Sequence, residues 1–172
     1  MNATAGHERG PSAFTDAQRA GLDTSRADRN RTLAAIHRLE AALSAAAAGR
    51  EASWRTDVAD ALAVLEAATG DEQRNAAEPD SLLSDIARTQ PRLRNRVRGL
   101  RAAYQTLRDT TAALSAELTD SADDLDIDDF RRRLAWLLTA VRHQWARESD
   151  LVYEAYFEAF HRDLEVDARR QK

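Results

Sequence analysis

Apolar side chains recur along this chain at alternating steps of three and four residues, the spacing that places them on one face of an α-helix. The clearest run, from residue 91 to 118, comprises Leu93, Val97, Leu100, Tyr104, Leu107, Thr111, Leu114 and Leu118. A second run begins near Asp128, continues past Phe160 and comprises Phe130, Leu134, Leu137, Val141, Gln144, Glu148, Leu151 and Ala155. Both are heptad seams, which are typical of antiparallel helices packed in a bundle.

Two earlier long helices and one short helix follow from the same pattern. Residues 28–48 carry an apolar face that Gly49 ends, and residues 53–78 carry another that begins at a Ser and stops before Pro79. Residues 81–89 predict a short helix with Leu82, Leu83 and Ile86 facing inward.

The predicted fold is therefore all-α: an up-down-up-down antiparallel four-helix bundle over residues 28–163, with the short extra helix between the second and third long helices. Residues 1–27 are expected to form a partly flexible N-terminal arm, with a turn of helix near Phe14, and residues 164–172 a C-terminal tail. No strand is expected.

Composition narrows the class of protein. Hydrophobic residues make up 43% of the 172 residues and charged residues 31%, which is ordinary for a soluble helical protein. The absence of Cys excludes disulfides and thiolate metal sites. A net charge of −4 argues against a general nucleic-acid binder. Without a run of 18 apolar residues or an apolar signal region, we expect a cytoplasmic protein that does not contact membranes.

Two charged segments resemble binding motifs. Asp124, Asp126 and Asp128 open like a calcium loop, but Asp129 stands where Gly is needed and Ala135 where a bidentate Glu is needed, so we expect them to cap the next helix. A second segment is rich in arginine and has no aromatic residue among its basic side chains, so we expect a solvated helix surface. Its basic residues are Arg88, Arg92, Arg94, Arg96, Arg98 and Arg101.

Polar residues interrupt the two heptad seams at one level. Tyr104 precedes the connection near Asp124 by as many residues as Gln144 follows it, which puts both about 30 Å from the connection at 1.5 Å per residue. We therefore expect a polar core layer of Tyr104, Gln144 and Glu148. The Tyr104 hydroxyl should bond to Glu148 or Gln144, because a buried hydroxyl without a partner costs about 1–3 kcal/mol.

Three segments resemble the hemerythrin-like family, which builds a di-iron site inside a four-helix bundle. They are "AAIHRLEAAL", "HQWARE" and "AAEPDSLLSDIARTQPRLRNRVRGLRAAYQTL", and the resemblance spans about residues 30–160. It implies non-heme iron held by a ligand set that would include His37, Glu78, His143 and Glu148. Two positions depart from the family pattern: Arg74 stands four residues before Glu78, where the family has His, and Tyr104 stands where the third helix carries His. Arg cannot ligate a metal.

The sequence thus favours a hemerythrin-like bundle without a complete di-iron site or other cofactor, acting as a binding or regulatory module rather than as an enzyme. One alternative is a metal-binding protein that carries oxygen or senses iron through non-heme iron. The other is a helical protein that binds phosphate or nucleic acid. A ferritin-like di-iron site is disfavoured, because Glu158 and His161 form the single Glu-x-x-His match.

An aromatic band on the last predicted helix is the candidate interaction surface. Tyr153, Tyr156, Phe157 and Phe160 overhang the end of the bundle if the helices pair as counted. An uncovered aromatic patch of this size is unusual on a monomer. We expect either that the 81–89 helix and the N-terminal arm cover it, or that a partner protein or a second copy of the chain docks there.

Overall fold

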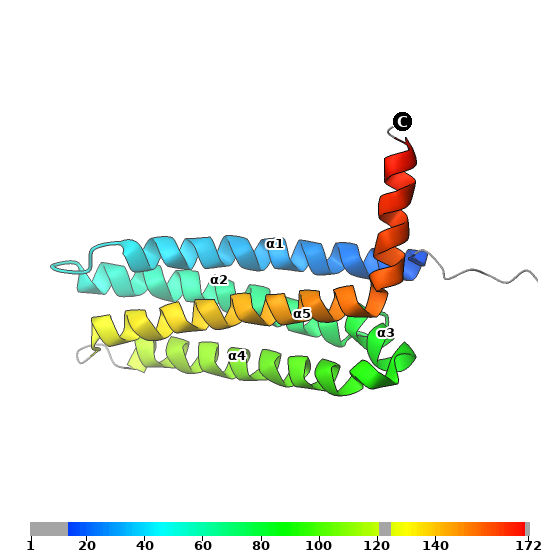
Figure 1. Cartoon of the computed structure of the whole chain (residues 1–172). Coiled ribbons are helices and arrows are strands. Elements are labelled where there is room, and N and C mark those ends of the chain that lie inside the picture. The colour runs from blue at the N-terminus through cyan, green and yellow to red at the C-terminus, as the bar shows by residue number, and fades with distance from the viewer. Residues whose placement is uncertain (1–13, 121–124, 171–172) are drawn as a thin grey trace, which may run out of the picture.

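The computed structural model describes residues 14–120 and 125–170, and the side chains of all of these except 158, 159 and 162–170. Its elements are α1 (Asp16–Ser44), α2 (Glu51–Ala77), α3 (Leu82–Thr89), a 3-10 turn (Pro91–Leu93), α4 (Arg94–Asp120) and α5 (Ile127–Arg170). Figure 1 shows the four long helices side by side, with α3 at one end. The described residues contain no strand, so the all-α prediction is confirmed.

The first helix begins earlier than the sequence analysis placed it. The Thr15 side chain accepts a hydrogen bond from the Gln18 backbone, while the Gln18 side chain accepts one from the Thr15 backbone. This capping box starts α1 at Asp16, so residues 16–27 are helix and not arm. The apolar periodicity of this stretch is weak because several of its residues line a cavity, described below, instead of packing in the core. Residues 1–13 lie outside the described residues.

The last helix also differs from the prediction, since α5 continues through the expected tail to Arg170. Its backbone is non-helical at Tyr156, where φ is −117° and ψ is 22°. Figure 1 shows the turns beyond this kink leaving the bundle at a steep angle. At its other end, Asp126 accepts from the backbone N–H groups of Asp128 and Asp129, at 3.1 and 3.0 Å. Asp126 thus caps α5, as expected, whereas Asp124 lies outside the described residues.

Two apolar clusters form the core. The larger one joins α1, α2, the C-terminal half of α4 and the N-terminal half of α5, and its fully buried members include Ile36, Leu39, Trp54, Leu62, Leu65, Phe130, Leu134 and Leu137. The smaller one joins α3, the start of α4 and the later part of α5, through Leu82, Leu83, Ile86, Leu93, Val97, Leu100, Leu151, Val152 and Tyr156, with Phe14. Full burial of each such side chain stabilises the fold by about 1.5–3 kcal/mol. Along each long helix, polar residues separate the two clusters.

Half of the aromatic band packs in the smaller apolar cluster, through Tyr156 and Phe160, and the other half is exposed. Phe14 packs against Tyr156 and Phe160, with ring centroids 5.5 and 4.8 Å apart, so the residue just before α1 covers this half of the band. Tyr153 and Phe157 stack edge to face with each other, and they remain 51% and 42% exposed.

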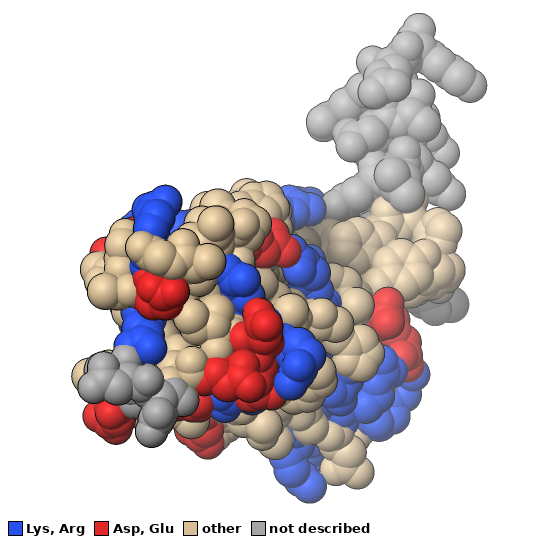
Figure 2. All heavy atoms as spheres, turned by 90° about the vertical axis from the view of Figure 1, so that its left-hand side faces the viewer, with Lys and Arg blue, Asp and Glu red and all other residues tan. Residues whose placement is uncertain are grey.

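Surface charge at the opposite end of the bundle is mixed. Figure 2 views the end formed by the α1–α2 and α4–α5 connections, where acidic and basic side chains alternate over the described surface. Several of them pair: Arg133 bonds to Glu117 and Asp129, and Arg132 bonds to Asp129 at 2.6 Å. Within the described residues, no helix is long and apolar enough to cross a membrane.

Candidate functional site

The polar layer between the two core clusters contains two buried glutamates. Glu148 lies on the α5 seam, and Glu72 follows Val58 and Leu65 on α2 at steps of seven residues, so both point into the bundle. Each is only 6% exposed. Asp28 and Thr32 on α1 and Tyr104 on α4 are buried at the same level, and each of the four long helices thus contributes a polar side chain.

Hydrogen bonds tie this layer together around Tyr104. Its hydroxyl contacts Glu148 Oε2 and also lies 3.3 Å from Glu72 Oε1. A phenol has one hydrogen to donate, so donation to Glu148 leaves the tyrosine oxygen free to accept a hydrogen bond from Glu72 when Glu72 is protonated. Glu72 itself accepts from Trp145 Nε1 at 2.8 Å and from the Thr32 hydroxyl at 3.0 Å.

Burial controls the protonation of these groups. It raises the pKa of Glu72 to about 7; the hydrogen bond from Thr32 opposes the shift, and the negative charge of Glu148 adds to it. Burial likewise raises the pKa of Glu148, against the hydrogen bond from Tyr104 and the positive charge of Arg29. The pKa of Tyr104 is raised by burial and by both carboxylates, so its phenol stays neutral. Near neutral pH the layer therefore holds a proton that an exposed glutamate would have lost.

Neither buried glutamate has an ion-pair partner among the described residues. The nearby Arg29 instead donates to the Ser149 hydroxyl at 3.0 Å and lies 5.9 Å from the centre of the Trp145 ring. Asp28 differs, because it pairs with Arg31 and accepts from the Asn75 amide at 2.9 and 3.1 Å. Glu72 and Glu148 are thus buried carboxyl groups without a salt bridge to a described residue.

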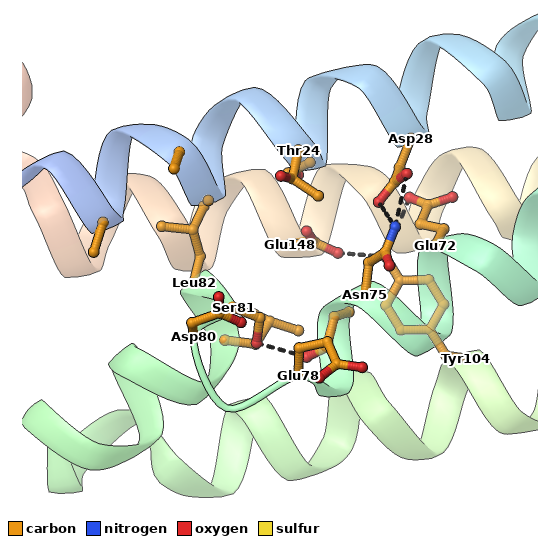
Figure 3. Close-up of a pocket in the computed structure, with 16 residues that line it drawn as sticks. Thr24, Asp28, Glu72, Asn75, Glu78, Asp80, Ser81, Leu82, Tyr104 and Glu148 are labelled. Atoms are coloured by element: carbon orange, nitrogen blue, oxygen red, sulfur yellow. Dashed lines mark hydrogen bonds between the residues drawn. The ribbon is translucent and has the colours of Figure 1, made fainter.

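The two glutamates border a cavity of about 310 Å³ between α1, the end of α2 and the start of α3. The cavity exists because α1 presents small side chains where a core helix would carry Leu; these are Ala17, Ala20, Gly21, Thr24 and Ser25. Figure 3 shows Glu148, Asp28 and Tyr104 gathered at one end of the cavity and Leu82 toward the other. Glu78 and Asp80, in the connection from α2 to α3, are exposed and also line it.

The residues implied by the hemerythrin-like resemblance are placed in two groups. Glu78 and Glu148 line the same cavity, one exposed and one buried. His37 and His143 are exposed and lie outside its lining, because each is one residue from a seam position and so points about 100° away from the core. No three His, Cys, Asp or Glu side chains within the described residues are grouped so as to hold a metal ion. Arg74 is exposed and bonds to Asp71.

The polar layer itself extends beyond the residues expected from sequence. Tyr104, Gln144 and Glu148 are all buried, and the hydroxyl of Tyr104 bonds to Glu148 as its seam position predicts. The Gln144 amide donates instead to the Leu100 carbonyl at 2.9 Å. Glu72, Asp28 and Thr32 were missed. The seven-residue step from Leu65 to Glu72 was the signal that would have found the first of these.

The side chains of the arginine-rich segment fall into two groups in the structure. Arg92 and Arg96 both bond to Glu154, and Arg88 bonds to Asp85 at 2.6 Å. The others, Arg94, Arg98 and Arg101, follow steps of four and three along one exposed face of α4, where no ion-pair partner is found among the described residues. Three of the six arginines are therefore paired with carboxylates, and the other three form an exposed stripe on one helix face.

Comparison with known proteins adds no relative to this description. No family model matches the chain, and neither a curated protein nor a solved structure matches it significantly. The chemistry of the acidic cavity is consequently the basis on which a function is assigned.

Proposed function

We propose that this protein is a binding module that takes a positively charged ligand into the acidic cavity. The observation that supports this most directly is that Glu72 and Glu148 are both buried and that neither forms a salt bridge with another residue of the described part of the chain. Burying a carboxylate costs several kcal/mol unless a nearby cation or a proton compensates it. In the free protein a proton serves this purpose, and a bound cation would serve it better because it also fills the cavity.

A binding role suits the cavity lining better than a catalytic one. The described lining has no Cys, His or Lys, the side chains that most often act as nucleophiles or exchange protons near neutral pH. The phenol of Tyr104 is held neutral, and its proton is committed to Glu148. We therefore assign no reaction to the site.

The bundle and its buried polar layer also bear on the resemblance to the hemerythrin-like family. The close approach of α1 to α2, of α2 to α4 and of α4 to α5 supports an up-down-up-down bundle, with α3 as the extra helix between α2 and α4. In such a bundle the place of a di-iron centre would be occupied by carboxylates and a tyrosine, without the imidazoles. We infer a bundle of this type that retains an internal cation site but not a complete set of iron ligands.

Titration of the purified protein with cations tests the proposal. Isothermal titration calorimetry with alkali and divalent metal ions and with organic ammonium ions should show saturable binding of one class. Glu148→Gln should weaken it at least tenfold, whereas Glu66→Gln, on α2 and outside the cavity lining, should not. Elemental analysis of protein from iron-supplemented cells tests the di-iron alternative: two irons per chain with an oxo-bridge absorption band would support that alternative and contradict the proposal.

A second candidate function rests on the stripe of Arg94, Arg98 and Arg101, which could contact the phosphates of a nucleic acid. Contacts of this kind release counterions, so the affinity would fall steeply with salt, with a slope near −0.9 for each phosphate contacted in double-stranded DNA. Fluorescence anisotropy with a labelled duplex, repeated from low to physiological salt, measures that slope. The variant Arg94→Gln/Arg98→Gln/Arg101→Gln should abolish binding if this candidate is correct.

A further inference from the structure

The charged side chains that line the cavity are all acidic. Its 16 residues include five carboxylates, Asp28, Glu72, Glu78, Asp80 and Glu148, and no basic side chain, although the chain has 25 Lys and Arg residues. Like charges that face one cavity repel each other and raise its affinity for cations. A single monovalent cation would leave most of this charge uncompensated.

The carboxylates occupy two depths. Asp28, Glu72 and Glu148 are buried, and Glu78 and Asp80 are exposed in the connection between α2 and α3. Both sets border the same 310 Å³ of space. Figure 3 shows the side chains of Glu78 and Asp80 on the side of the cavity where that connection passes, away from Asp28 and Glu148. A ligand that satisfies both sets needs positive charge at two separated points.

The remaining lining is largely apolar. Ala17, Ala20, Ala76, Leu82 and Leu83 contribute methyl and methylene surface between the polar side chains. Leu82 and Leu83 are themselves buried, and the Leu82 side chain packs so closely on α1 that a Cβ at Gly21 would lie 3.1 Å from Leu82 Cγ. Apolar surface of this kind gains free energy when it is covered by methylene groups, at about 25 cal/mol for each Å² removed from water.

A metal ion fits these features poorly. Magnesium and calcium need six or more oxygen ligands around one point, and the described residues hold no group of three acidic or imidazole side chains that converges in this way. The oxygens of Glu72 already accept from Thr32 and Trp145, and Glu148 accepts from Tyr104. A hydrated ion would also leave the apolar lining in contact with water.

We propose that the ligand of this cavity is a linear aliphatic diammonium ion, with one ammonium group at Glu72 and Glu148 and the other at Glu78 and Asp80. The methylene chain between the two charges covers Leu82 and the alanines of α1. This inference rests on the proposed function, because it names the class of cation that the cavity takes. The buried ammonium supplies the counter-ion that Glu148 lacks, and its N–H groups donate to carboxylate oxygens.

Calorimetric titration at pH 8 and physiological salt tests the inference with a series of α,ω-diaminoalkanes of three to eight carbons. Monoamines of the same lengths, magnesium and manganese are titrated in parallel. We expect one diamine length to bind best, at least tenfold more tightly than the monoamine of equal length. Glu78→Gln/Asp80→Asn should lower the affinity for the diamine to that for the monoamine and leave monoamine binding unchanged. Both substituted side chains are exposed, so this variant should fold normally, as circular dichroism can verify.

Glu148→Gln should weaken monoamine and diamine binding alike, by at least tenfold, because it removes the buried charge that both share. The inference is overturned if monoamines bind as tightly as diamines, or if metal ions bind and amines do not; in either case the proposed function stands. If no cation of any class binds, the proposed function fails as well.

Discussion

Replacing Glu72 by Gln should make the protein more stable at pH 8 and leave its stability near pH 5 almost unchanged. The amide keeps the shape of the side chain but cannot ionise. Its oxygen can take the place of Oε1, which accepts from Trp145, and its NH2 group can take the place of Oε2 and donate to the Thr32 hydroxyl oxygen. In the wild type, burial raises the pKa of Glu72 from its ordinary value of 4.5 to about 7. The substitution therefore removes the titration of a buried group and little else.

The direction of the effect follows from proton linkage. Between pH 4.5 and 7 the folded protein keeps a proton on Glu72 that the unfolded chain has lost, so the free energy of unfolding of the wild type falls as pH rises through this range. The rise in the pKa of Glu72 on folding lowers the free energy of unfolding by roughly 3 kcal/mol once the pH exceeds the folded-state pKa. The raised pKa of Glu148 also makes the free energy of unfolding fall as pH rises. The Glu72→Gln variant keeps this second contribution.

Urea denaturation followed by circular dichroism, from pH 4.5 to 8.5, measures this effect. The Glu72→Gln variant should show a flatter profile than the wild type and a gain of about 1–3 kcal/mol at pH 8. Glu66→Gln, on the same helix and outside the cavity lining, is the control and should follow the wild-type profile. A Glu72→Gln variant that loses the same free energy at pH 5 and pH 8 would refute the reasoning, because it would show that the carboxyl group acts through packing or hydrogen bonds alone.

Three further substitutions test the layer and the end of the bundle. Tyr104→Phe removes the hydroxyl that bonds to Glu148, and it should lower the free energy of unfolding by about 1–3 kcal/mol in urea titrations at pH 8; an unchanged midpoint would contradict the bond. Phe14→Ala should cost about 3–5 kcal/mol in the same titration, because Phe14 is buried against Tyr156 and Phe160, whereas a surface residue would cost almost nothing. Phe157→Ser, at a side chain 42% exposed, should change stability by less than about 0.5 kcal/mol and leave a monomer by light scattering; a native oligomer that this variant dissociates would instead support docking through the aromatic band.

The sequence predicted the all-helical fold because the seam residues of α4 and of α5 up to the Tyr156 kink keep the heptad spacing for many turns and are apolar at most positions. It predicted a bond from Tyr104 to Glu148 or Gln144 for the same reason, since two seams that share a connection fix which residues lie level, and the structure shows the bond to Glu148. The cavity could not be predicted this way. Ala17, Ala20 and Gly21 are weakly apolar, and residues that border empty space leave no periodic signal that separates them from a loop.

Glu72 was missed for a different reason. Its seam position was visible in the step of seven from Leu65, but residues 69–75 contain no apolar side chain, so the apolar face of this predicted helix stops before Glu72. The structure continues the helix through the buried Gly70 to Ala77. The exposure of His37 and His143 shows another limit: each is one residue from a buried position, and the angle around the helix decides whether a side chain reaches the interior.

The division of the core into two apolar clusters by a polar layer has a consequence for the dynamics of the molecule. The smaller cluster joins α3 to Phe14, the start of α4 and the later part of α5, and the buried polar residues separate it from the larger cluster. Such a unit can open without unfolding the rest, so its amide hydrogens should exchange at a lower opening free energy than those around Trp54 and Phe130. That opening would lift Leu82 from α1 and expose the buried carboxylates, which gives a ligand a route into the cavity while most of the bundle stays folded.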